Sequence, residues 1–176
     1  MSNVLIGIIG VILFIGLALA GALFLGPRFQ ESTNNSRGSA VIQAVAQISN
    51  AANMYRVQEG VAVLSNANID TVLRANGYLK SVPSNPTSDI YVPLMSTAGG
   101  VRNATAPAEY VVMQLTDNAA SVCAAIAKQT GQTLLADGSA PEASTALPIQ
   151  PSGCVKMTAG LGTALTNGGY YAFSRI

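Results

Sequence analysis

The chain has 176 residues, a formal net charge of +1 and charged side chains at only 10% of its positions. This balance excludes the strong electrostatic field with which a protein attracts nucleic acid or an acidic surface. The sequence contains no histidine, so the commonest general base and the commonest metal ligand are both missing. We therefore expect no catalytic centre, no cofactor and no metal, and we expect that the protein is not an enzyme.

The first element is an apolar stretch at Val4–Leu25 that contains no charged side chain. As a helix with a rise of ~1.5 Å per residue it would span ~33 Å, about the thickness of a bilayer's hydrocarbon core. We expect residues 1–26 to form a membrane or filament-core helix. Its contacts would come from Val4, Leu5, Ile8, Val11, Phe14, Leu17, Leu23 and Phe24.

A cleavable signal peptide and a plain membrane anchor are two other possible roles for this stretch. A cleavable signal peptide is disfavoured, because Met1–Asn3 carries no basic side chain and the apolar run is longer than a signal peptide needs. A plain membrane anchor fits its length and stays open.

The stretch also contains residues that weaken a helix. Each glycine costs a helix ~1 kcal/mol relative to alanine in water, and proline breaks the backbone ladder. Such a segment suits a subunit that leaves a membrane and enters a helical filament. We predict helix melting or kinking at Gly16, Gly21, Gly26 and Pro27.

Residues 27–59 form the amphipathic half of the same helix. Ser32–Ser39 is polar, is poor in helix formers and contains Gly38, which predicts an interruption. The helical period then returns, and Glu59-Gly60 is a typical C-terminal stop. The apolar stripe consists of Val41, Val45, Ile48, Ala52 and Tyr55.

Residues 60–176 predict a globular αβ head, so the fold class is α+β. We expect a short helix at Asn68–Arg74 that Gly77 stops, and a loop at 82–86. We expect a second helix at Ala119–Lys128, which Thr116–Asn118 caps and Gly131 ends. Residues 132–152 have the composition of a long surface excursion. Strands are predicted at Ile90–Val92 (ended by Pro93), Glu109–Leu115, Cys154–Met157 and Tyr170–Ser174.

The two cysteines, Cys123 and Cys154, are not in C-x-x-C spacing, which disfavours zinc and redox sites. In a chain with a membrane or export segment they predict one structural disulfide, formed outside the cytoplasm. Two unrelated buried thiols are the alternative. The bond would close a loop of roughly 30 residues and contribute ~3–4 kcal/mol.

Other residue types have simpler structural explanations. Asp70, Asp89 and Asp117 are scattered singly, as caps or loop residues are, whereas a calcium site needs several convergent oxygens. The tyrosines at 110, 170 and 171 favour sheet and core positions over a ligand-stacking surface. Asn34 and Asn103 lie in N-x-S/T patterns, which are frequent by chance.

The order of these elements resembles the type IVb pilins, and most of all the toxin-coregulated pilin and conjugative-plasmid pilin group. The matching residues are Tyr55, Gly60, Asn85-Pro86, the run Tyr110–Thr116 leading to Cys123, then Cys154, and finally Gly169–Phe173. The chain departs from the family near its start, where Leu5 stands in place of the usual glutamate and no acidic residue precedes Glu31. The family's short basic leader is also absent, so we expect either that Met1 is the processed end or that processing differs.

The resemblance implies a type IV pilin fold, in which a long N-terminal helix packs on the antiparallel-type sheet of a small head. It implies a homo-oligomeric helical filament that serves adhesion, aggregation or conjugation. The subunit would wait in the inner membrane, and the pilus assembly machinery would export it to the cell surface. The disulfide-bounded region 123–154 would lie on the exposed surface. The alternative is a single-pass, membrane-anchored periplasmic binding or interaction protein that does not polymerise.

Overall fold

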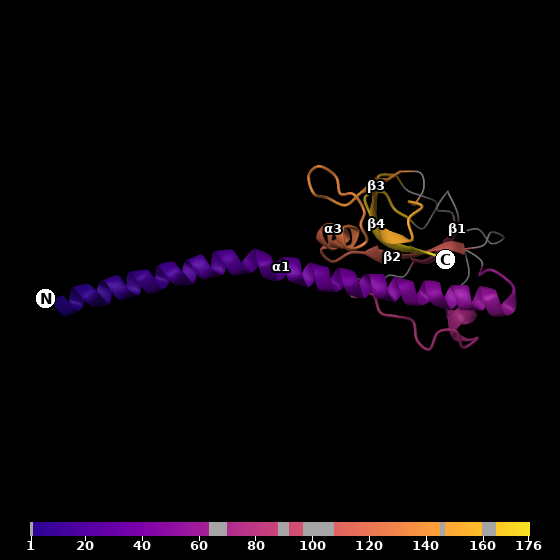
Figure 1. The fold of residues 1–176 in the computed structure, drawn as a ribbon, viewed down its shortest axis with the longest axis horizontal. Helices are drawn as coiled ribbons and strands as arrows, with labels where there is room; N and C mark the ends of the chain where they lie inside the picture. The colour runs from indigo at the N-terminus through magenta and orange to yellow at the C-terminus, as the bar shows by residue number, and fades with distance from the viewer. Residues whose placement is uncertain (1, 64–69, 88–91, 97–107, 145–146, 160–164) are drawn as a thin grey trace. The chain divides into compact units, whose positions relative to one another are not determined.

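The computed structural model describes residues 2–63, 70–87, 92–96, 108–144, 147–159 and 165–176 (Figure 1). The chain divides into two compact units, Met1–Asn34 and Asn35–Ile176. The predicted strand residues Ile90 and Tyr91 lie outside the described residues, as do Asp89 and Asn103.

Helix α1 (Ser2–Glu59) runs without a break through 32–39, so the predicted interruption there is wrong. Two hydroxyls donate back to carbonyls one turn earlier, Thr33 Oγ1 to Phe29 at 2.9 Å and Ser39 Oγ to Asn35 at 3.0 Å. These bonds occupy polar side chains that could otherwise compete with the helix. Gly38 has a packing role: a Cβ there would lie 3.1 Å from Cγ1 of Ile126, so the glycine allows a close approach of the following helix, α3 (Ala119–Gln129).

The second unit is built on a five-stranded sheet with the order β1-β2-β5-β4-β3. β2 pairs antiparallel with β1 and β5, and β5 pairs antiparallel with β4, whereas β3 pairs parallel with β4. The α+β class is therefore confirmed, but the sheet is mixed and not purely antiparallel. The strands are β1 (Val92–Ser96), β2 (Ala108–Leu115), β3 (Glu142–Ala143), β4 (Ser152–Met157) and β5 (Tyr170–Arg175).

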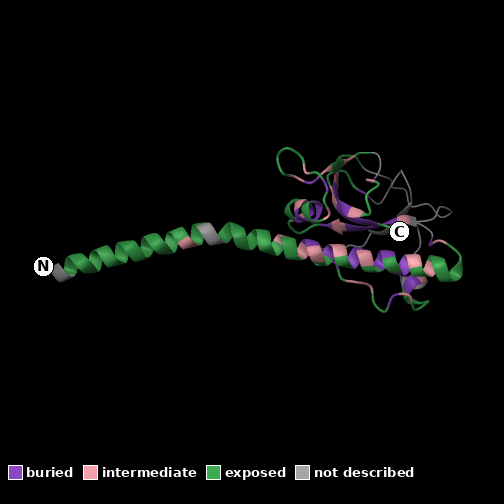
Figure 2. Ribbon diagram, in the orientation of Figure 1, coloured by how far each residue is buried: buried purple, intermediate pink, exposed green. Residues whose placement is uncertain are grey.

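Both faces of the sheet are buried at β2, β4 and β5, because successive side chains point to opposite faces and consecutive residues of these strands are buried. On one face, Val111 and Met113 of β2 pack with α3 and with the predicted apolar stripe of α1. On the other face, Val112 and Phe173 pack with Leu147 and Leu165 from the loops. Val41, Val45, Ile48 and Ala52 are all buried, which confirms the predicted stripe (Figure 2).

The ends of the helices follow local sequence signals only in part. α1 ends at Glu59, and Gly60 adopts a left-handed φ of 67°, as predicted. Before α3, however, Asn118 itself is left-handed (φ 51°) and makes no side-chain cap bond. Thr116 instead donates its hydroxyl to the carbonyl of Thr87 at 2.6 Å, which ties the end of β2 to the 82–87 loop. The predicted short helix appears as a π-helical turn, η1 (Asp70–Arg74).

Two further sequence predictions need correction, one for a strand and one for a loop. β1 begins at Val92 and continues past Pro93 to Ser96, with register shifts on either side of Leu94-Met95. A proline is tolerated there because β1 is an edge strand. The segment 132–152 is also more than a surface excursion, since it contains β3 and buries Gln132, Ala140 and Leu147.

Candidate functional site

Most of the large apolar side chains that are exposed in the described chain lie on the first part of α1, from Val4 to Leu23. The most apolar window of the helix has a mean hydropathy of 2.8, and none of it is buried. Phe14, Leu17 and Leu23 are 73%, 74% and 77% exposed. Figure 2 shows this part of α1 almost entirely in the colour of exposed residues. Of the predicted contact residues, Val4, Leu5, Ile8 and Val11 are likewise exposed, and nothing is described of the side chain of Phe24. This helix is long and apolar enough to span a membrane.

This surface is apolar around the whole helix and not along one stripe, since consecutive residues such as Ile8 and Ile9, or Ile12 to Ile15, are all exposed. A helix of this kind is stable when it is surrounded by lipid or by other helices. Burying one large apolar side chain contributes ~1.5–3 kcal/mol. The seven predicted contact residues that are described as exposed would together contribute on the order of 10–20 kcal/mol on transfer from water.

The glycines of this stretch face open space. A Cβ added at Gly7, Gly10, Gly16, Gly21 or Gly26 would meet no described atom within 4 Å outside its own helical neighbourhood. The packing of the described residues therefore does not require glycine at any of these positions. Two purposes remain: a close approach of another helix, or a lower helix stability.

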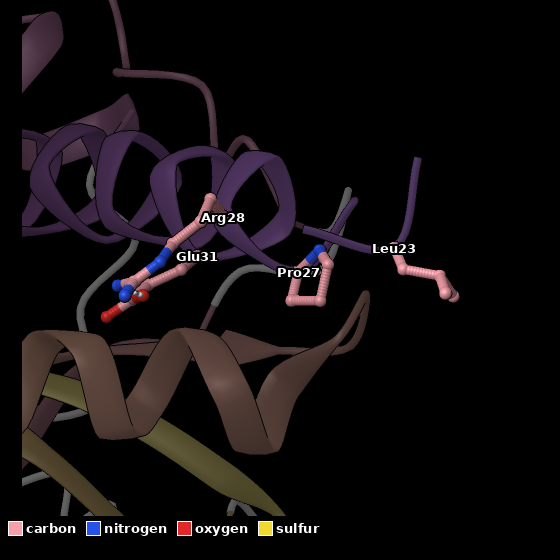
Figure 3. Close-up of a pocket in the computed structure, with 4 residues that line it drawn as sticks. All are labelled: Leu23, Pro27, Arg28 and Glu31. Atoms are coloured by element: carbon pink, nitrogen blue, oxygen red, sulfur yellow. Dashed lines mark ion pairs between the residues drawn. The ribbon is translucent and has the colours of Figure 1, made fainter. Parts of the chain in front are cut away.

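Pro27 lies inside α1 and has no N–H to bond the carbonyl of Leu23 one turn earlier. These two residues line an open hollow together with Arg28 and Glu31, all from the same helix (Figure 3). Figure 3 shows the side chains of Arg28 and Glu31 pointing toward one another, and their ion pair measures 3.6 Å. Both side chains are largely exposed, so the pair adds little stability. Gly16, Gly21, Gly26 and Pro27 are all helical in this structure.

The predicted disulfide is present. Cys123 of α3 is bonded to Cys154 of β4, and both cysteines are fully buried. The side chain of Gln132 also contacts this region, because its Oε1 accepts a hydrogen bond from the backbone N–H of Cys154 at 2.7 Å. The disulfide and this bond fix the start of the 132–152 segment against the sheet.

Two charged groups order the outer part of that segment. Asp137 accepts hydrogen bonds from the hydroxyl and the N–H of Ser139, and these lower the pKa of its carboxyl group. Lys156 of β4 donates to Glu142 of β3 at 2.9 Å, which raises the pKa of the lysine. Asp137 is exposed and Lys156 is half-buried, and both form part of a solvated surface.

Asn85, the polar member of the Asn85-Pro86 pair, is buried. Its Nδ2 donates to the carbonyl of Gln114 at 2.7 Å, and its Oδ1 accepts from the N–H and hydroxyl of Thr87. The residue therefore holds the loop against β2. Tyr110 and Tyr171 are buried in the second core cluster and Tyr170 is half-buried, as sheet and core residues are.

One polar cluster was not predicted. The hydroxyl of Tyr78 donates to Glu59 at 2.7 Å, and the Tyr78 ring packs edge-on against Tyr55 with ring centroids 5.3 Å apart. The hydrogen bond to the carboxylate raises the pKa of the Tyr78 hydroxyl. No spacing rule links residues from a helix end and a loop, so local pattern could not have found the pair.

A scan against models of known protein families, a search of curated proteins and a search of solved structures each found no match to this chain. Within the residues that the structure describes, no group of three or more Cys, Asp or Glu side chains is placed to hold a metal ion.

Proposed function

We propose that the protein is a pilin, the repeating structural subunit of an extracellular filament of the type IVb kind. The observation that carries the proposal is the first part of α1. It is apolar on every side, none of its described residues is buried, and it belongs to the same helix that supplies the core stripe of the head. Such a helix gains stability from many neighbours of its own kind.

The edge strands of the sheet are poorly suited to pairing with another copy, which favours assembly through the apolar helix. An exposed sheet edge is a template for pairing with another chain. Here one edge strand, β1, contains Pro93 and register shifts, and the other, β3, has only two residues. Neither edge offers a long regular strand, so a polymer of this subunit would use the apolar helix.

The disulfide supports a location of the head outside the cytoplasm, where such bonds persist. In this proposal the apolar helix holds each subunit in the inner membrane and later joins the filament core. Lipid and a helix bundle are both apolar, so the transfer changes the free energy little. The resemblance to type IVb pilins supplies the remaining part, an assembly machinery that drives the export.

The residues that weaken the helix are consistent with a transfer from the membrane to the filament core. Gly16 to Pro27 is the part of α1 that contains three glycines and the proline, and none of the three glycines is needed for packing within the described chain. We place helix melting there, in the assembled filament.

Electron microscopy of material sheared from cells that produce the protein tests the proposal. We expect filaments that contain this chain, and their loss in Leu17→Asp, which places a charge in the apolar surface. Gln43→Asp, on the exposed face of the helix in the head, is the matched control and should keep them. An abundant membrane-bound protein without filaments would instead identify the alternative, a single-pass anchored periplasmic interaction protein.

A further inference from the structure

The outer edge of β4 is closed in an unusual way. β4 pairs with β5 along its whole length but with β3 only at Lys156 and Met157. Three amides on this outer side, two in β4 and one just after it, have different acceptors. The N–H of Lys156 donates to the carbonyl of Pro141 at 2.9 Å, and the N–H of Thr158 to that of Ala143 at 3.0 Å. The N–H of Cys154 donates to a side chain, Oε1 of Gln132, at 2.7 Å.

Gln132 is held in the position that a neighbouring strand's carbonyl would take. The residue is 7% exposed and follows Gly131, whose left-handed φ of 73° ends the turn after α3. Its own N–H donates to the carbonyl of Ala127 at 2.8 Å, which fixes the backbone from which the side chain extends.

Gly153 makes room for this carboxamide. A Cβ at Gly153 would overlap the amide group of Gln132, so any other residue would displace the glutamine. Glycine weakens a strand interior unless another group approaches closely. One contact therefore explains both a glycine in β4 and a buried glutamine elsewhere in the sequence.

We propose that Gln132 guards the outer edge of β4 and prevents a second copy of this chain from pairing there. The second copy is the occupant because it presents the same β4 edge, and two such edges can pair antiparallel about a two-fold axis. β1 is a poor partner, because it contains Pro93 and register shifts. With the guard in place, copies of the chain that stand close together keep their sheets separate.

The test uses the full chain in detergent micelles and two variants that remove the contact from opposite sides, Gln132→Ala and Gly153→Ala. Gln129→Ala is the control, because Gln129 is an exposed glutamine at the end of α3 that bonds Asn35 and Ser39. Amide hydrogen exchange is measured by NMR at Cys154 and Lys156 in samples dilute enough to be monomeric, because a β4–β4 dimer would protect the Cys154 amide again. We expect exchange at least tenfold faster at Cys154 in both variants, with Lys156 unchanged, and parental rates in the control.

Light scattering over a range of higher concentrations gives the degree of association. We expect a dimer fraction several-fold above that of the control, since association through α1 is common to all samples. Unchanged exchange at Cys154 in both variants would overturn the contact. Faster exchange without additional dimer would overturn the guarding role. If Gln132→Ala does not fold, Gln132→Asn, which keeps the amide but is too short to reach Cys154, replaces it under the same criteria.

Discussion

Removing the disulfide tests the head most directly. Replacing both Cys123 and Cys154 by alanine avoids a free thiol and leaves no buried hydroxyl at either fully buried site. The bond joins residues 31 apart in sequence. For a loop of that length the chain-entropy relation gives ~3.5–4 kcal/mol at 25 °C. For a chain of this size that loss lowers the unfolding temperature by roughly 8–15 °C.

Thermal unfolding in detergent micelles measures this loss. The near-ultraviolet circular dichroism of the buried tyrosines, Tyr110 and Tyr171, reports the head alone, because the apolar part of α1 contains no tyrosine. Ser121→Ala, an exposed change in α3, is the control and should unfold with the parent. A double variant that unfolds within ~3 °C of the parent would refute the reasoning, since the loop entropy would then be largely absent. The same variant should yield few or no filaments.

Three further predictions follow from single side chains. Ile48→Ala should lower the free energy of unfolding in urea by ~2–5 kcal/mol, because Ile48 is fully buried against the sheet. The control Gln47→Ala, at an exposed neighbour, should change this free energy by less than ~0.5 kcal/mol, and equal changes in the two variants would contradict the packing. Pro27→Ala should stabilise the helix by ~3 kcal/mol and slow amide exchange at residues 28–31, and it should reduce the number of filaments if assembly requires melting. Unchanged amide exchange would contradict a weakened helix around Pro27. Asp137→Ala should lower stability at neutral pH. Because the carboxyl pKa is lowered from 3.8 in the folded state, the difference from the parent should shrink as the pH falls below that value, and a constant difference in urea midpoints would contradict it.

Periodic local patterns predicted the elements that dominate the fold. The stripe from Val41 to Ala52 has a helical period and is buried. The β-branched and aromatic run in β2 forms a strand whose two faces belong to the two core clusters. In these segments the side chains that favour the local structure are the same ones that pack, so propensity and burial agree. The disulfide was predictable because the chain has only two cysteines.

The errors occurred where a residue serves a distant contact. Gly38 predicts a helix break by propensity, yet the glycine lies where Ile126 packs closely against the helix. Gln132 lies in a segment with loop composition, but its carboxamide replaces a strand at Cys154. Pro93 predicts the end of a strand, and the edge position of β1 removes that restriction. Local sequence does not show which residue from a distant part of the chain will pack against a given position.

The glycines separate what the chain builds by itself from what it leaves for neighbours. Gly38 and Gly153 are explained by contacts within the head, and Gly60 and Gly131 by left-handed backbone. The glycines from 7 to 26 have neither explanation, since each is helical and faces open space. A helix that is apolar on every side also lacks any contact that would stabilise it in water. The weakening residues and the exposed apolar surface coincide in one stretch of α1, as the proposed function expects of a helix that lipid or other copies of the chain surround.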